Sequence, residues 1–248
     1  LGHSARDTFT MLHEAGIAME AKDFAVGVRV EHPQRLIDQN QYKEAAGHPR
    51  LKAAEYRLTC QTQEGRGVYS FCMCPGGTVV ASASEAEAIV TNGMSEYARS
   101  QANANSALLV QVRRSDFGEG VLDGMRYQQK LEHQAWILGG SHGQAPCQRI
   151  ADYLNGQGSS AFGQVIPSYS RGVTMTDLHA LFSPSINRAL EEALADFNQK
   201  IPGFTDPDAL MTGVETRSSS PVRILRDEQF QSLTTAGLYP AGEGAGYA

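Results

Sequence analysis

Apolar and polar residues alternate from Val68 to Cys74, which predicts a β-strand with two different faces. One face carries the larger side chains, Tyr69, Phe71 and Met73. The other face carries the smaller ones, Val68, Ser70, Cys72 and Cys74. We expect the rest of the chain to be organised around this stretch.

A proline and two glycines follow the alternating stretch. Pro75 cannot donate a backbone hydrogen bond, and Gly76 and Gly77 tolerate positive φ, so a tight reversal is predicted here. Thr78–Ala83 would then return as the second strand of a hairpin. The small residues at the turn would let another backbone, or a flat ligand, come close.

Other strands are predicted where alternation or apolar content recurs. They are Phe24–Val30, Ala54–Cys60, Ala88–Asn92, Ala107–Val112, Leu210–Arg217 and Val222–Leu225. In the first of these, Arg29 lies on the face opposite the phenylalanine and valines. Short connections favour antiparallel pairing, so we expect about eight mostly antiparallel strands.

Three stretches have a helical period. Ser4–Ala15 begins with a possible capping box from Ser4 and Asp7, and Gly124–Leu138 follows a capping Asp123. Pro184–Lys200 has proline at its first helical position after a capping Ser183. Residues 34–50 are expected to form a short helix and a loop, and residues 141–175 a long loop with one or two helical turns at Cys147–Leu154. The predicted class is α+β, with a mostly antiparallel sheet or a barrel-like arrangement and three or four helices.

Composition narrows the possible partners. The chain has 248 residues, 41% of them hydrophobic, and a net charge of −6 without a Lys/Arg cluster, which argues against nucleic acid. Apolar runs are too short for a membrane span, so no membrane partner is expected. Four cysteines in this length favour a reducing compartment, and we expect a cytoplasmic protein. The chain starts on Leu1 and stops in a glycine-rich turn, so we expect a fragment of a longer protein.

Cys72 and Cys74 are candidates for chemistry. They could form half of a metal site, face a flavin in a redox role, or simply pack; a second cysteine pair is missing from the sequence, so no metal is expected. Histidine is the common general base, and His32 stands beside Glu31 where a strand ends before Pro33. Catalytic roles are therefore assigned to His32, Cys72 and Cys74.

Arginines near the end of the chain are candidates for anion binding. Arg217 and Arg223 flank a serine-rich turn and could clamp a carboxylate or phosphate. The alternative is salt bridging with Glu215 and Asp227. Together with Gly76 and Gly77, the two arginines form the predicted substrate-binding set.

A glycine-rich segment closes the chain. A short strand is predicted at Leu238–Ala241, and it runs into glycines placed to open a helix. Such a turn exposes backbone N–H groups to an anionic ligand. The predicted cofactor-binding residues are Gly242, Glu243, Gly244 and Gly246.

Seven motifs along the chain carry a resemblance to a known family. They are Gly2-His3-Ser4-Ala5-Arg6-Asp7, Gly27-Val28-Arg29-Val30-Glu31-His32-Pro33-Gln34, Phe71-Cys72-Met73-Cys74-Pro75-Gly76-Gly77, Asn92-Gly93-Met94-Ser95, Gly213-Val214-Glu215-Thr216-Arg217, Ser220-Pro221-Val222-Arg223 and the glycine-rich end. In these motifs the chain resembles the C-terminal half of bacterial FAD-dependent dehydrogenases, also called NAD(FAD)-utilizing dehydrogenases.

The resemblance implies a layout and a cofactor. Residues 1–16 would end one piece of a Rossmann-like FAD domain, residues 17–235 would form an inserted substrate-side domain, and residues 236–248 would return to the FAD domain. Glu243 or the amides beside it would lie near the ribityl and pyrophosphate of FAD. The glycine-rich fingerprint that follows the first strand of such a domain is missing from this sequence.

The resemblance therefore implies FAD in the full-length protein and none in this chain alone. The partners would be the FAD-binding part of the same polypeptide and a small-molecule substrate. The expected function is the substrate side of an oxidoreductase, inactive by itself. Two alternatives stay open, a non-catalytic binding or scaffold domain and a cysteine-based thiol redox or metal module.

Overall fold

The computed structural model describes residues 2–247. The chain divides into two compact units. Unit 1 combines Leu1–Val26, Gln111–Lys130 and Arg217–Ala248, and unit 2 combines Gly27–Val110 and Leu131–Thr216.

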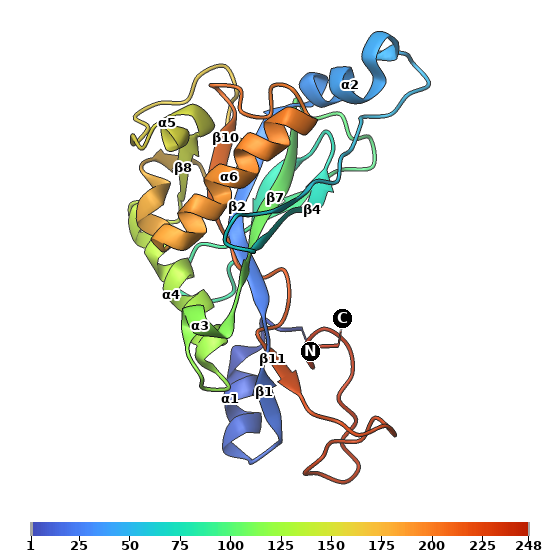
Figure 1. Cartoon of the computed structure of the whole chain (residues 1–248), viewed down its shortest axis with the longest axis vertical. Helices are drawn as coiled ribbons and strands as arrows, with labels where there is room; N and C mark the ends of the chain where they lie inside the picture. Colours follow the sequence, from blue (N-terminus) through green and yellow to red (C-terminus); the bar gives the residue numbers. More distant parts are fainter. Residues whose placement is uncertain (1, 248) are drawn as a thin grey trace. The chain divides into compact units, whose positions relative to one another are not determined.

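Unit 2 is organised around a seven-stranded sheet (Figure 1). In spatial order its strands are β3 (Thr59–Gln61), β4 (Gly67–Cys74), β7 (Asn103–Val112), β2 (Phe24–Pro33), β10 (Leu210–Glu215), β8 (Ala145–Arg149) and β9 (Val173–Met175). The β3/β4, β4/β7, β2/β10 and β8/β10 pairs are antiparallel, and β8/β9 is parallel. The open, mostly antiparallel sheet with its helices confirms the α+β class.

Helix α6 (Pro184–Lys200) packs on this unit with one face buried. Its boundaries and its N1 proline confirm the prediction, although Ser183 makes no side-chain capping bond. Buried Ile186, Leu190 and Phe197 recur at helical spacing, so the apolar stripe defines the helix.

The shorter elements of unit 2 lie in the connections. They are α2 (Gln34–Tyr42), η1 (Lys43–Ala45), α5 (Ile150–Leu154), η2 (Leu178–Leu181) and the β5 (Thr78–Ala81)/β6 (Thr91–Met94) pair. The short helix expected in residues 34–50 is confirmed.

The predicted hairpin of Val68–Cys74 with Thr78–Ala83 is wrong. Strand β4 pairs with β3 and β7, whereas β5 pairs with β6. Gly77 donates its backbone N–H to Asn103, and Gln101 donates to Gly76, so the turn is bonded to the segment leading into β7. Alternation identifies a strand but does not reveal which distant segment will pair with it.

Several local predictions are also corrected. Residues 54–58 are not assigned to a strand, the strand expected at Ala88–Asn92 begins at Thr91, and residues 238–241 form no strand. The long loop expected at residues 141–175 contains the unpredicted strands β8 and β9, whereas α5 confirms the one or two helical turns expected at Cys147–Leu154. Among residues 2–247, no helix combines the length and apolar character needed to cross a membrane.

Unit 1 is built from segments at both ends of the chain and one from the middle. It contains α1 (Arg6–Glu14), the antiparallel pair of β1 (Met19–Ala21) and β11 (Val222–Ile224), α3 (Arg114–Phe117) and the first part of α4 (Asp123–Leu138). The start of α1 is also a correction, because Ala5 is the N-cap and neither Ser4 nor Asp7 forms the expected box. Its core contains Phe9, Leu122, Met125 and Val222.

Glycine at position 27 is required by the close approach of β2 and β7. A Cβ at Gly27 would overlap the backbone carbonyl of Leu108, which cannot move aside as a flexible side chain could.

We expect Gly27→Ala to reduce the free energy of unfolding in urea by about 3 kcal/mol. Gly158→Ala is the matched control, because its Cβ would meet only ordinary contacts at 3.5 Å or more. Equal unfolding midpoints for the two variants would contradict the packing argument.

Candidate functional site

Arg29 of β2 is fully buried, and its guanidinium lies in a polar network inside unit 2. Its Nε and Nη2 groups donate to Glu215 of β10 at 2.5 and 3.0 Å, and Nη2 also donates to Asn92 of β6 at 3.0 Å. Its Nη1 group donates to the carbonyl of Cys72 at 2.8 Å and to Asn105 of β7 at 3.2 Å. All five donors of the side chain therefore have acceptors, and five strands meet at one charge.

The Arg29–Glu215 pair is charge-compensated within the core. Burial raises the pKa of the Glu215 carboxyl, and the bidentate contact with the Arg29 guanidinium opposes that rise. The sequence interpretation that paired Glu215 with Arg217 or Arg223 is thereby corrected. The sequence offered one signal, because a charged side chain interrupts the otherwise apolar strand predicted at Phe24–Val30; it indicates that Arg29 needs a partner but does not identify Glu215.

A β-bulge separates the two cysteines of β4. Phe71 pairs with Ala107 and Cys74 with Asn105, so β4 has one residue more than β7 in this interval. Cys72 has φ of 43° and an exposed side chain, while Cys74 is buried and its thiol donates to the Cys72 carbonyl. The prediction that both thiols share one face is therefore wrong.

Burial also affects the chemistry of Cys74. It raises the pKa of the Cys74 thiol, which favours the protonated and less reactive form. The four cysteines are free thiols, and no cluster of three or more metal-ligating side chains occurs in residues 2–247.

Gly76 and Gly77 are buried against neighbouring backbone. A Cβ at Gly76 would overlap the carbonyl of Arg99, and one at Gly77 would overlap the carbonyl of Met94. The Gly76 N–H donates to the side chain of Gln34 at 2.7 Å. The close approach expected at this turn is therefore made by the chain itself.

His32 lies in the core of unit 2, with its ring against Phe204 at 4.5 Å between centroids. Its Nε2 contacts the Phe204 carbonyl at 2.7 Å, which requires Nε2 to carry the proton and donate. Burial lowers the pKa of His32 to about 4, against the opposing effects of this bond and of Asp206. A neutral and fully enclosed imidazole favours a packing role for His32 over a role in proton transfer with a substrate.

The predicted arginines belong to unit 1. Arg223 pairs with Glu20 at 3.1 Å, and both side chains are more than one third exposed. Arg226 lies over the ring of Tyr247 at 3.6 Å and donates to the carbonyl of Pro240. The alternative partners proposed from sequence, Glu215 and Asp227, are therefore not the ones that Arg223 uses.

Both ends of the described chain meet in unit 1. His3 contacts the carboxylate of Glu243, and burial lowers the pKa of His3 although this carboxylate acts in the opposite direction. A small cavity of about 160 Å³ adjoins the contact. It is lined by Gly2, Ala5, Thr8, Phe9, Leu12, Ile224, Pro240, Ala241, Gly244 and Ala245.

The glycine-rich end forms a compact turn in place of the predicted strand and helix start. Gly242 and Gly246 have φ of 75° and 83°, and Tyr247 donates its N–H back to the Gly242 carbonyl. A Cβ at Gly246 would approach the carbonyl of Val222 within 2.6 Å. Of the predicted cofactor-binding residues, Gly244 lines the cavity and Glu243 contacts His3.

The predicted site residues are thus divided between the two units. His32, Cys72, Cys74, Gly76 and Gly77 lie in unit 2, and the remaining six lie in unit 1. Their joint role in one site remains a prediction.

Removal of the Arg29 charge is expected to cost more than removal of its partner. Glu215→Gln should lower the free energy of unfolding by about 3–5 kcal/mol, because it leaves a buried cation without its counter-charge. Arg29→Met should cost more, because all five hydrogen bonds of the guanidinium are lost, whereas glutamine at 215 keeps one acceptor oxygen for Arg29. Glu64→Gln, which breaks the exposed pair with Arg188, is the control and should cost less than about 1 kcal/mol. Urea unfolding of the three variants tests this order, and similar values for Arg29→Met and Glu64→Gln would contradict it.

His32 is expected to make folding stability depend on pH. The unfolded chain binds a proton on this histidine near pH 6.5, whereas the folded chain does so only near pH 4. The free energy of unfolding should therefore be constant above about pH 6.5. It should fall as the pH drops from there toward about 4, and the loss should reach about 2 kcal/mol at about pH 5. Urea unfolding at about pH 7.5 and about pH 5 should show a smaller pH effect in His32→Gln than in the wild type. An equal pH effect in both proteins would contradict the assignment.

Comparison with known proteins places the chain in a family. Over all of its length it is 49% identical to a protein of Clostridium beijerinckii described as an uncharacterized protein, and it spans 47% of that relative. Residues 23–218 match the family described as FAD-dependent protein, C-terminal domain-like. The match covers well over half of the chain, and the chain therefore belongs to this family.

Proposed function

We propose that the chain is the substrate-side part of an FAD-dependent oxidoreductase whose FAD-binding part lies in the same polypeptide. The family membership over residues 23–218 supports a flavoprotein, and the chain spans about half the length of the relative it matches. In this proposal residues 17–235 form the inserted domain, and residues 1–16 and 236–248 belong to the FAD domain.

The observation that carries the proposal is the contact between His3 and Glu243 beside a cavity lined by glycines, alanines and larger apolar residues. It joins segments from the two ends of the chain, which are the segments assigned to the FAD domain. A cavity of about 160 Å³ is smaller than the 300–1,000 Å³ typical of ligand sites, so it fits one part of a dinucleotide and not the whole.

The residues of the C-terminal turn are chemically suited to such a part. Gly242 is exposed and would have no atom within 4 Å of an added Cβ, which allows close approach of a diphosphate, while the buried Gly244 lines the cavity beside it. The half-exposed carboxylate of Glu243 can accept hydrogen bonds from sugar hydroxyls. When bound, FAD would supply the hydride-accepting chemistry, and this chain would supply orientation and shape.

Among the predicted catalytic residues, Cys72 is the one most accessible to a substrate. Its side chain is exposed, whereas Cys74 and His32 are buried. We therefore assign Cys72 to the substrate face. In this assignment, Cys74 and His32 have a structural role, because their buried side chains pack in the core near the ends of β4 and β2.

A charge placed in the C-terminal turn should weaken flavin binding. We expect Gly242→Asp in the full-length protein to lower the flavin content roughly tenfold at limiting FAD, because the new carboxylate repels the diphosphate. Gly156→Asp is matched to it, since both glycines are exposed, have φ of 75° and 65°, and would have no atom within 4 Å of an added Cβ. Flavin released by heat is measured by its visible absorbance for each variant.

The same samples test the redox assignment. Anaerobic addition of NADH or NADPH to the flavin-loaded wild type should bleach the flavin absorbance if the protein is a dehydrogenase of this type. A full-length protein without flavin, or equal flavin in the two glycine variants, would overturn the proposed FAD site. Flavin that neither nucleotide reduces would leave the FAD site standing and remove NAD(P)H as the reductant.

A further inference from the structure

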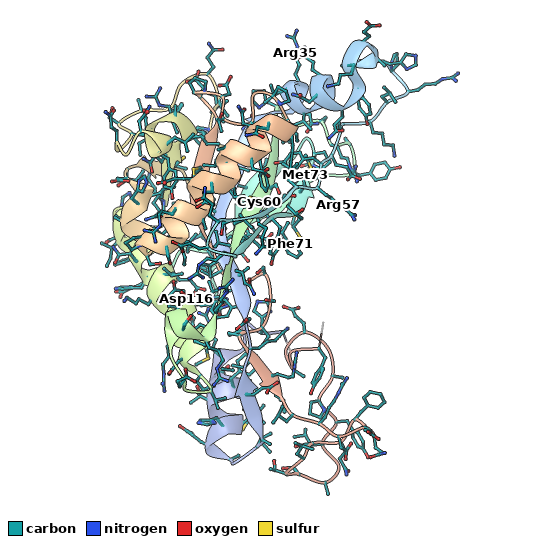
Figure 2. The ribbon with its side chains drawn as sticks, viewed as in Figure 1. Arg35, Arg57, Cys60, Phe71, Met73 and Asp116 are labelled. Atoms are coloured by element: carbon teal, nitrogen blue, oxygen red, sulfur yellow. The ribbon has the colours of Figure 1, made fainter. Side chains whose placement is uncertain are left out.

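A groove with mixed aromatic and charged walls lies along β4 in unit 2. Its volume is about 520 Å³, and it is lined by residues 55–59 and residues 69–73; we call it the β4 groove. Figure 2 shows Arg57, Phe71 and Met73 clustered along β4, with Arg35 away from them on α2. Cys72, which the proposed function assigns to the substrate face, also lines this groove, but that proposal uses none of its charged and aromatic side chains.

The groove is a consequence of how two extended segments pair. Leu58 donates its N–H to the Ser70 hydroxyl, and Ser70 donates its N–H to the Leu58 carbonyl, both at 2.8 Å. Tyr56 and Leu58 are buried, and the alternation of an extended chain then turns Arg57 outward. The groove is thus fixed by hydrogen bonds between neighbouring extended segments, and a ligand would meet a preformed surface.

Two aromatic rings form a corner in the groove. The rings of Tyr69 and Phe71 are 6.4 Å apart and nearly perpendicular, at 87°. A flat ring placed in this corner can stack on one ring and meet the edge of the other, which are the favoured aromatic geometries. Phe71 is 39% exposed and Met73 is half-buried, so apolar area is available to a ligand.

Arg57 supplies a positive charge without a partner of its own. Within residues 2–247 it makes no ion pair and no side-chain hydrogen bond, whereas the neighbouring Glu55 pairs with Arg99 at 4.0 Å. A guanidinium binds a carboxylate through two parallel hydrogen bonds. The Glu55 carboxylate, two residues away, disfavours a second negative charge on the ligand.

We propose that the β4 groove binds a planar aromatic molecule that carries a single carboxylate. The ring would occupy the Tyr69/Phe71 corner, and the carboxylate would bind Arg57. A volume of about 520 Å³ is within the range of ligand sites, and apolar walls with few polar groups are typical of them. This inference goes beyond the proposed function and stands without it, because binding in the groove requires no flavin.

Calorimetric titration of the full-length protein tests the ligand class. The probes are benzoate, 2-naphthoate and indole-3-acetate, each compared with its neutral amide. We expect at least one acid to bind with Kd below about 1 mM and about tenfold more tightly than its amide. Failure of all three acids to bind in that range, or equal affinity for acid and amide, would overturn the proposal.

Variants locate the site. Arg57→Gln should remove the preference for the acid, and Phe71→Ala should weaken acid and amide alike. Arg35→Gln, an exposed arginine on α2, should leave both affinities unchanged. Retention of the preference in Arg57→Gln, or its loss in Arg35→Gln, would place the site elsewhere. Flavin content measured on the same samples keeps this result separate from the outcome for the FAD site.

Discussion

The buried charge of Arg29 is the interaction on which unit 2 depends. A guanidinium enclosed in a core is tolerated only when its charge is matched and its donors are satisfied. Glu215 supplies the charge, and Asn92, Asn105 and the Cys72 carbonyl supply the remaining acceptors. These groups come from β10, β6, β7 and β4, so the requirement of one side chain fixes the relative positions of five strands.

The same requirement accounts for residues that look unrelated in the sequence. A Cβ at Gly93 would overlap the Arg29 guanidinium and the Asn105 amide. Position 93 therefore requires glycine, because the network occupies the space that a side chain would need. The bulge in β4 turns the Cys72 carbonyl toward Arg29 and places Cys72 at positive φ. Cysteine in that conformation is strained, and the hydrogen bond to a full charge offsets the strain.

The sequence predicts the elements whose signal is local and misses those whose signal is distant. Helix α6 and strand β2 follow from periodicity within their own residues. Strand β8 is missed because its sequence, Ala-Pro-Cys-Gln-Arg, includes a proline and shows no alternation of apolar and polar residues. The contact between Arg29 and Glu215 joins positions 186 apart, and no local pattern encodes that pairing.

The candidate site is predictable to a similar extent. The sequence predicts a catalytic role for Cys72. The bulge that exposes the Cys72 side chain depends on the hydrogen bond from Arg29 to the Cys72 carbonyl. From sequence, Arg29 could be placed on a strand face but not in this contact. The structure shows that His3 contacts Glu243, while the assignment of both ends to one FAD domain remains a prediction. The unpartnered state of Arg57 could not be read from sequence, because it depends on which distant side chains the fold brings near it.

Strand β4 connects the buried network to the groove beside it. At Cys72 the carbonyl points to the Arg29 network, while the same residue lines the β4 groove. A shift of the network would therefore move the wall of the groove, and a rigid network holds that wall in place. Binding sites are most selective when side chains that contact ligand are fixed by a second layer of bonded groups. In this chain the second layer is the charge-compensated core, and so the interaction that stabilises unit 2 also defines the surface offered to a ligand.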